Sequence, residues 1–289
     1  MHSLVLDIAG TLSSAANLFV VAAGLTLVFG AMRIINMAHG SFYMYGAFAV
    51  TTVLGVSAGW RFWLALLAGA AVAAAAGLLV EVTVIRRLYD AEHLTQLLAT
   101  YAVLLIFADI AQRVWGTGYR TVTPPAVLAS GVDVAGVQVP RYELFVICAG
   151  VLVGVALWVM LARTRFGWLL RAAVQDPESI ATAGINLTRL RTGVFVLGAF
   201  LAGLGGALTA PLQSIAPGMD ASIIVSVFIV VTIGGLGSVP GAAIGALIIG
   251  LAQTLGAEFF ASWAASLIYL IMIVVLAIRP WGLLGVPER

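Results

Sequence analysis

The stretch GLTLVFGAMRIINMAHGSFYMYGAF, residues 24–48, determines the class of fold. It is apolar except for a polar patch of Arg33, Asn36 and His39, which a glycine flanks on each side. Polar groups inside a membrane segment are costly and usually face a cavity or a partner. Non-helical backbone at membrane depth is tolerated only where it is buried in protein or lines water. The stretch therefore predicts a helix, a turn and a second helix that line a cavity or gate. The alternative is an interfacial segment whose arginine snorkels to water.

The composition of the whole chain agrees with a membrane protein. Of its 289 residues, 62% are hydrophobic and only 9% are charged, and the mean hydropathy is +1.12. A soluble domain carries about 25% charged residues. We therefore expect an all-α polytopic membrane protein, with a single transmembrane domain over residues 1–289 and lipid around it.

The ionisable residues argue against several kinds of chemistry. All 14 basic residues are arginines, so the lysine that a P-loop or a Schiff base requires is absent. One cysteine, Cys148, and three scattered histidines do not have the spacing of a metal site. The arginines lie at the ends of apolar segments rather than in a patch that would bind nucleic acid. We expect no enzyme activity in this chain, no cofactor, no metal and no nucleic-acid partner.

Apolar segments of the right length predict about eight or nine crossings of the membrane. The candidates are 8–30, 41–57, 61–84, 95–114, 144–162, 189–212, 221–236, 240–258 and 263–279. Three of them (41–57, 221–236 and 240–258) are short or interrupted by glycine and are read as half-helices or re-entrant pieces, which would make eight crossings equally acceptable. The distribution of arginines favours an N-terminus outside and a C-terminus inside. The opening MHSLVLDIAG lacks a basic n-region, so no cleaved signal peptide is expected.

Two connections are long enough to have structure of their own. The outer one, about 115–143, contains VDVAGVQVP, whose alternation predicts a small β-hairpin around Ala135–Gly136. The inner one, about 163–188, contains Asp176-Pro177-Glu178, which is typical of a helix start, and Gly184 suits the position just past the end of that helix. Neither connection reaches the ~50 residues of a domain, so any ATPase must be another chain.

The helix that begins near Asp176 is too short to persist alone, so it must dock on something. One interpretation is that it packs under its own bundle. The other is that it is presented to a cytoplasmic partner, with Ala181 on its small apolar face.

A second interrupted segment occupies IGGLGSVPGAAIGALIIG, residues 233–250. Gly237, Gly241 and Gly245 repeat every four residues, which places them along one helix face and allows close packing in lipid. Pro240 and the preceding pair Gly234-Gly235 interrupt its start. Interruptions in both halves of a transporter point to the translocation site, so we expect a pathway or gate here and an internal pseudo-repeat. Ordinary helix packing is the alternative explanation for the ladder.

Three acidic residues in or near the spans have structural interpretations. Asp109 is expected to pair with Arg113 one turn later rather than to act as a proton relay. Glu81 falls near a span end and is expected at the membrane interface, and Asp220 is expected to cap the next helix.

Four motifs in order resemble one family over essentially the whole chain. MRIINMAHG (32–40) followed by YMYGAF (43–48) resembles the signature of the branched-chain amino acid permease family of ABC importers, in its smaller, H-type subunit. Residues 163–188 resemble that family's cytoplasmic loop, and Glu178 and Gly184 resemble part of the EAA-x-x-x-G element of importer permeases. The segments 233–250 and RPWGLLG (279–285) are also similar to the family pattern. Many members have an acidic residue where this chain has Ser41, which leaves the exact substrate open.

The resemblance implies a permease subunit that moves branched-chain or related amino acids across the bacterial inner membrane by alternating access. It implies as partners two ATP-binding subunits, a second related permease and an extracytoplasmic substrate-binding protein. The residues expected to couple to the ATPase are Arg171, Gln175, Asp176, Pro177, Glu178, Ala181 and Gly184. Those expected in the pathway or gate are Arg33, Asn36, His39, Gly40, Ser41, Gly234, Gly235, Gly237 and Gly241. The alternative is a stand-alone secondary transporter or channel for a small polar solute such as urea or an amide, with Asp109 as its coupling acid.

Overall fold

The computed structural model describes residues 2–54, 59–134, 136–176, 180, 182–259 and 262–285, and helices dominate it. The helices are α1 (His2–Met32), α2 (His39–Leu54), α3 (Arg61–Thr83), the 3-10 turn η1 (Ile85–Leu88), α4 (His93–Trp115), α5 (Ala126–Ala129), α6 (Arg141–Arg163), α7 (Arg165–Gln175), α9 (Leu187–Thr209), α10 (Met219–Gly234), α11 (Val239–Phe259) and α12 (Ala264–Ile278). Strands β1 (Gly131–Val134) and β2 (Val137–Pro140) pair antiparallel, which confirms the predicted hairpin. Ala135 lies outside the described residues.

Six of the described helices are long and apolar enough to cross a membrane. They are Leu4–Met32, Arg61–Thr83, His93–Trp115, Arg141–Arg163, Leu187–Thr209 and Val239–Phe259. Met219–Gly234 and Ser266–Ile278 are shorter apolar helices. Interpreting 240–258 as a half-helix is therefore wrong, because α11 is one continuous helix of 21 residues. The other two short segments correspond to α2 and α10, and 16 residues rise only about 24 Å, less than the thickness of the hydrocarbon core.

Helix α9 is the centre of the bundle and packs against α1, α2 and α3. Glycines make these contacts close: a Cβ added at Gly203 would lie 2.2 Å from the Ala73 Cβ, and one added at Gly46 would lie 2.1 Å from the Gly203 carbonyl oxygen. In lipid, small residues at helix interfaces let backbones approach and gain dispersion contacts. The short helix α2 is therefore held tightly between α3 and α9.

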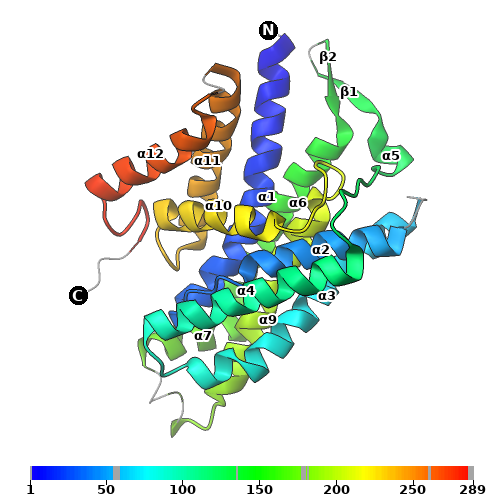
Figure 1. Cartoon of the computed structure of the whole chain (residues 1–289). Coiled ribbons are helices and arrows are strands. Elements are labelled where there is room, and N and C mark those ends of the chain that lie inside the picture. Colours follow the sequence, from blue (N-terminus) through cyan, green and yellow to red (C-terminus); the bar gives the residue numbers. More distant parts are fainter. Residues whose placement is uncertain are drawn as a thin grey trace.

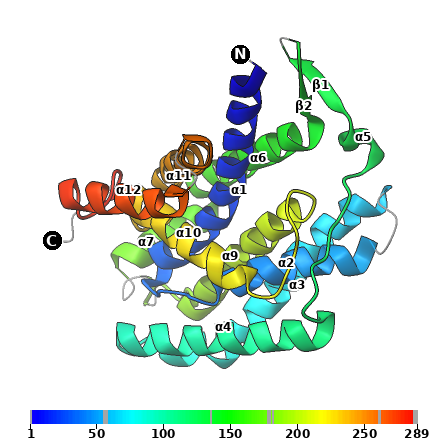
Figure 2. The same ribbon diagram turned by 45° about the horizontal axis from the view of Figure 1, so that its top comes forward.

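The two long connections lie at opposite ends of α1 (Figures 1 and 2). The β1–β2 hairpin projects beside the N-terminal end of α1, and β2 contacts that helix. Helix α7 lies near the C-terminal end of α1 and contacts it as well. This arrangement agrees with the expectation that residues 115–143 and 163–188 emerge on opposite sides of the membrane.

The glycine packing around α2 gives a direct stability prediction. A Cβ at Gly206 would lie 1.9 Å from the Tyr43 carbonyl oxygen, a backbone atom that cannot move aside cheaply. We expect Gly206→Ala to lower the free energy of unfolding by about 1–3 kcal/mol, the usual cost of overpacking. Thermal unfolding of the detergent-solubilised protein, followed by circular dichroism, measures the change.

The matched control is Gly10→Ala in α1, where nothing lies within 4 Å of the added methyl group. Alanine favours a helix over glycine by up to about 1 kcal/mol, so this variant should be neutral or stabilised. Equal melting temperatures for the two variants would contradict the packing argument.

Candidate functional site

The helical structure is interrupted between α1 and α2, as the sequence predicts. Residues 33–38, the first break, are not helical, and Arg33 has φ +53°, the one positive φ at a non-glycine position in the part of the chain described. Thr100 of α4 holds the break, because its Oγ1 accepts from the Met37 N–H at 3.2 Å. Its single hydroxyl proton is shared between the carbonyl oxygens of Ile35, at 3.2 Å, and Leu97, at 3.1 Å. The turn is thus fixed by a side chain from a distant helix.

The polar residues of this segment have different environments. Arg33 is exposed, whereas Asn36 and His39 are completely buried. The His39 Nε2 lies 3.0 Å from the Val21 carbonyl oxygen on α1 and donates to it, since a carbonyl can only accept. The His39 Nδ1 and both polar side-chain atoms of Asn36 have no partner. Buried polar atoms usually find partners, so these are candidates to meet water or a solute.

The second break, residues 235–238, separates α10 from α11. Gly235 and Gly237 have φ values of +102° and +85°, which favour glycine. The segment 279–285 closes this turn from the side, because the Leu283 and Leu284 N–H groups donate to the carbonyl oxygens of Ile233 and Gly234 at 2.8 and 3.0 Å. The C-terminal motif thereby satisfies carbonyls that the end of α10 leaves open.

The predicted glycine ladder is only partly correct. Gly237 lies in the turn and not on a helix, because its backbone is left-handed. Gly241 and Gly245 do lie on α11 and face α10: added Cβ atoms would lie 2.1 Å from the Gly234 oxygen and 2.3 Å from the Val230 oxygen. These two positions support helix packing.

The two breaks meet in space, although they are about 200 positions apart in sequence. A Cβ at Gly30 would lie 3.2 Å from the Gly237 Cα, and one at Gly40 would lie 2.3 Å from the Asp220 carbonyl oxygen. The Ser41 Oγ donates to the Asp220 Oδ2 at 3.3 Å, and Asp220 is buried in the first turn of α10. The end of α1 thus contacts the second break, whereas Gly40 and Ser41 of α2 contact the opposite end of α10.

A pocket of about 580 Å³ opens where the breaks meet α7. Among its lining residues are Gly30, Arg33, Val174, Gly237, Ser238 and Trp281. We call it the inner pocket. It brings the exposed arginine of the first break next to the helix that begins the inner connection.

Helix α7 packs beneath the bundle by one face. The Thr164 Oγ1 accepts from the Gly167 N–H and caps its start, and the residues of its buried face are Gly167, Leu170 and Ala173. The last residue, Gln175, is exposed.

The guanidinium of Arg171 makes contacts with other residues of the same chain. It donates to the Leu161 carbonyl oxygen at the end of α6 and lies over the ring of Trp168, 5.7 Å from its centroid. A basic side chain at a helix C-terminus satisfies a free carbonyl and complements the dipole. Arg171 therefore fixes the α6–α7 corner.

Two backbone hydrogen bonds between described residues of the inner connection are typical of a short helix. The Ile180 N–H donates to the Asp176 carbonyl oxygen at 3.4 Å, and the Ile185 N–H donates to the Ile180 carbonyl oxygen at 3.3 Å. With Gly184 at φ +78°, the second bond is the six-to-one bond of a Schellman motif. Gly184 thus ends the helix, as predicted, and nothing lies within 4 Å of a Cβ built on it. Pro177, Glu178 and Ala181 lie outside the described residues.

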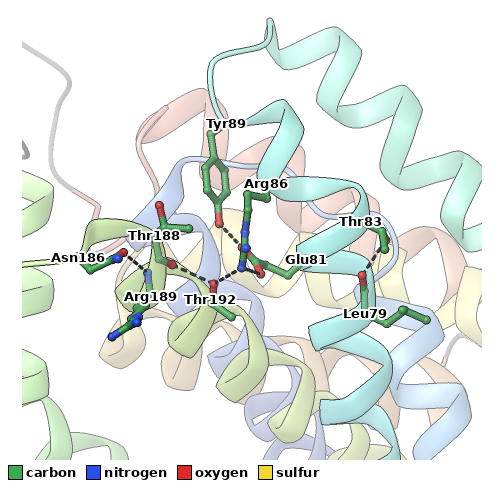
Figure 3. A network of polar contacts seen from close by, with 9 residues as sticks. All are labelled: Leu79, Glu81, Thr83, Arg86, Tyr89, Asn186, Thr188, Arg189 and Thr192. Carbon is green, nitrogen blue, oxygen red and sulfur yellow. Dashed lines mark hydrogen bonds and ion pairs between the residues drawn. The ribbon is translucent and has the colours of Figure 1, made fainter.

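Figure 3 shows a polar network that ties the end of α3 to the start of α9. Glu81 lies near the end of α3 and is completely buried within the protein. Its carboxylate pairs with the Arg86 guanidinium at 2.9 Å and accepts from the Tyr89 hydroxyl. Burial and this hydrogen bond raise the pKa of Tyr89, which therefore remains a proton donor at physiological pH.

The same network reaches the first turns of α9. Arg86 also donates to the Thr192 Oγ1 at 3.1 Å, and Thr192 donates to the Thr188 carbonyl oxygen. Asn186 caps α9, because its Oδ1 accepts from the Arg189 N–H at 3.0 Å. Helix α9 thus begins at a cap two residues after Gly184, and its second turn is anchored at Thr192 to Glu81 of α3 through Arg86.

Asp109 and Arg113 form the predicted pair, with 2.7 Å between Oδ2 and Nε. Both side chains are exposed, so the pair lies on the surface of this chain and not in its interior. This position does not suit a proton relay through the bundle.

Sequence reasoning missed a second set of polar residues inside the bundle, which includes Asn17, Tyr43 and Gln213. They line a smaller pocket of about 330 Å³. The available signal was Asn17 in the middle of an apolar span, since buried amides in membranes are costly.

Comparison with known proteins gives consistent findings. The family profile described as "Branched-chain amino acid transport system / permease component" matches residues 8–277. The high-affinity branched-chain amino acid transport system permease protein LivH of Escherichia coli (strain K12) is 28% identical, over 93% of this chain and 91% of that protein. BraD of Pseudomonas aeruginosa, a permease protein of the same description, is 28% identical over the same shares. The probable branched-chain amino acid transport permease protein LivH of Methanocaldococcus jannaschii is 30% identical over 94% of this chain and 90% of that protein.

The Glu81 network predicts a measurable contribution to stability. Tyr89→Phe removes one donor from a buried carboxylate and changes little else. A hydrogen bond to a charged group contributes about 1.5–3 kcal/mol, so the free energy of unfolding should fall by about that amount. Thr83→Val is the matched control, because its Oγ1 donates only to the Leu79 carbonyl oxygen of its own exposed helix turn. An equally small loss in both variants, measured by thermal unfolding, would exclude a structural role for the network.

Proposed function

The chain belongs to the family of branched-chain amino acid permease components, and we propose that it forms the membrane pathway of an ATP-driven ABC importer. It is a multi-pass protein of the inner (plasma) membrane, and its cargo is branched-chain or related amino acids. The observation that carries the mechanism is the meeting of the two broken segments above α7, at the inner pocket.

The partners follow from the kind of transport system to which the relatives belong. An ABC importer permease works with ATP-binding subunits and a substrate-binding protein. We propose two ATP-binding subunits on the cytoplasmic face, a second, related permease, and a binding protein that delivers the solute from outside. The described part of this chain contains no domain-sized soluble segment in which ATP hydrolysis could reside.

We propose the finer topology as well: nine crossings, with α2 and α10 as short ones, the N-terminus outside and residues 163–188 inside. The excess of arginines on the inner connections supports this orientation. Two helix–break–helix units, α1–α2 and α10–α11, support an internal pseudo-repeat.

The coupling mechanism uses the short helix that Gly184 ends. ATP binding closes the ATPase pair and pushes this helix, and the displacement passes to α9 on one side and to α7 on the other. Helix α9 packs on α2, and α7 borders the inner pocket, so the displacement of the short helix is transmitted to both breaks. ATP can shift the equilibrium between outward-open and inward-open states only by its differential affinity for them.

A stand-alone transporter or channel would require an ion-coupling acid in the bundle interior. Asp109, the candidate for that role, is a surface residue paired with Arg113. No observation therefore favours this alternative.

The coupling role predicts that Gly184→Val stops ATP-driven uptake. Valine is strained at φ +78°, by about 1–2 kcal/mol, and would distort the end of the short helix. Uptake of radiolabelled leucine into proteoliposomes that contain the complete complex should fall at least tenfold, while the protein remains in the membrane.

Gly116→Val is the matched control. Gly116 has φ +81° and equally open surroundings, but it ends α4 beside the outer connection. Its ψ of −179° places it in a region that only glycine readily adopts, so valine is strained there at least as much as at Gly184, yet most of the uptake should be retained. Full activity of Gly184→Val, or equal loss in both variants, would refute the coupling role.

The first test of the function as a whole is purification of the tagged chain in mild detergent, with mass spectrometry of what accompanies it. A P-loop ATPase and a second hydrophobic permease are expected. Isolation of the chain alone, with facilitated uptake that needs no ATP, would overturn the proposal.

The buried polar atoms of the first break give a further prediction. Asn36→Leu should impair uptake at least fivefold without loss of the ATPase from the complex, because both polar atoms of Asn36 are buried and have no protein partner to lose. Uptake and co-purification are measured on the same preparation. Loss of assembly would instead assign Asn36 a structural role.

A further inference from the structure

The smaller pocket has a lining of unusual chemistry for the interior of an apolar bundle. Its volume is about 330 Å³, at the lower end of the range for small-molecule sites. It lies between α1, α2, α10, α11 and the connection that follows α9, and its polar residues include Ser14, Asn17, Tyr43, Gln213, Ser226 and Gln253. None of the described residues that line it is charged, and apolar side chains such as Leu18 and Ile223 complete the wall. We call it the neutral pocket.

The polar residues of the neutral pocket are partly preorganised. The Asn17 Nδ2 donates to the Thr209 Oγ1 at 2.5 Å, and the Gln213 Nε2 donates to the Tyr43 hydroxyl at 3.1 Å. Asn17 is only 8% exposed, yet its Oδ1 has no partner. Gly205 beside it offers no side chain to meet this oxygen. This oxygen has almost no accessible surface and lies toward Gly205 of α9, so a ligand donor reaches it only when the Asn17 amide rotates toward the cavity.

The neutral pocket lies along α1 and α10, the same two helices that lead to the two breaks. Along α1, Asn17 lines the neutral pocket and Gly30 lines the inner pocket, while Val21, between them, holds the buried ring of His39. Along α10, Ser226 lines the neutral pocket and Thr232 lines the inner pocket. The two cavities thus follow the same pair of helices, and the buried His39 contact lies between them.

We propose that the neutral pocket is a transit site for the solute, on the outer side of the first break, and that it selects small zwitterionic molecules with an aliphatic side chain. This inference rests on the proposed transport function. Hydroxyl and amide groups both donate and accept, so they can hydrogen-bond an ammonium and a carboxylate together. The apolar wall accommodates the side chain. A fixed charge would hold one end of a zwitterion and oppose its release, whereas neutral groups bind both ends weakly enough for passage.

Cysteine protection tests the site directly. In a Cys148→Ala background, which removes the single native thiol, Ser226→Cys places a thiol in the pocket wall. The complete complex in proteoliposomes is treated with a charged methanethiosulfonate reagent, with and without L-leucine. We expect labelling that leucine slows at least threefold. Absence of labelling, or labelling that no imported solute slows, would overturn the transit site.

Two comparisons separate the failure of this inference from the failure of the proposed function. Val127→Cys, on the exposed helix α5 of the outer connection and outside both pockets, is the control, and leucine should not change its labelling rate. If the complex imports another solute, and only that solute protects Ser226→Cys, the site stands and the branched-chain assignment fails. If leucine is imported but does not protect, the function stands and the site fails.

A kinetic test addresses binding. Gln253→Leu removes a polar group from the wall and should raise the KM for leucine uptake at least fivefold, with little change in the rate of ATP hydrolysis. Thr254→Val is the matched control on the next residue, because the Thr254 Oγ1 donates to the Gly250 carbonyl oxygen of its own helix and does not line the pocket. An unchanged KM in Gln253→Leu, or an equal rise in both variants, would contradict a binding role.

Discussion

The close packing of α2 against α9 and α3 is the contact on which the rest of the structure depends. Helix α2 is too short to be held by its own length across the hydrocarbon core, and 13 of its 16 residues are buried. Its position is fixed because Gly46, Gly203 and Gly206 bring backbones together where no methyl group fits. Lipid provides no hydrophobic force between helices, so this contact supplies dispersion energy and fixes the register. Once α2 is placed, His39, Gly40 and Ser41 are placed with it.

Helix α9, which packs closely against α2, also follows directly after the inner connection. Helix α9 begins at an asparagine cap two residues after Gly184, and its second turn is bound to the buried Glu81 through Arg86. This link between α9 and Glu81 is important because a force applied to a frayed helix end would change only the local conformation and would not move the helix. A start fixed by charge-assisted hydrogen bonds can instead move as a unit with α3 or rotate about it. The glycine contacts then transmit that movement to the first break, since packed interfaces shift between discrete arrangements rather than deform continuously.

Local sequence patterns predicted local structure well. Both breaks, the hairpin, the end of the short helix at Gly184 and the Asp109–Arg113 pair follow from signals within a few residues, and the structure contains each of them. Features that the sequence did not predict arise where distant segments meet. Glu81 is buried where the end of α3 meets α9, to which Arg86 bridges it at Thr192, and Gly237 lies in a turn next to the α10 carbonyls that accept from Leu283 and Leu284. The neutral pocket joins Asn17 to Thr209, a relation that no helical period encodes.

The contact between Ser41 and Asp220 joins the start of α2 to the start of α10. The Ser41 hydroxyl donates to the Asp220 Oδ2 at 3.3 Å, while the Asp220 Oδ1 has no partner among the described residues. A hydrogen bond to a buried carboxylate offsets part of the cost of removing it from water. The dipole at the start of α10 favours the negative charge as well. The junction of α2 and α10 therefore depends on two neighbouring residues: Gly40 lets the backbones approach, because a Cβ there would lie 2.3 Å from the Asp220 carbonyl oxygen, and Ser41 donates to the carboxylate that this approach buries.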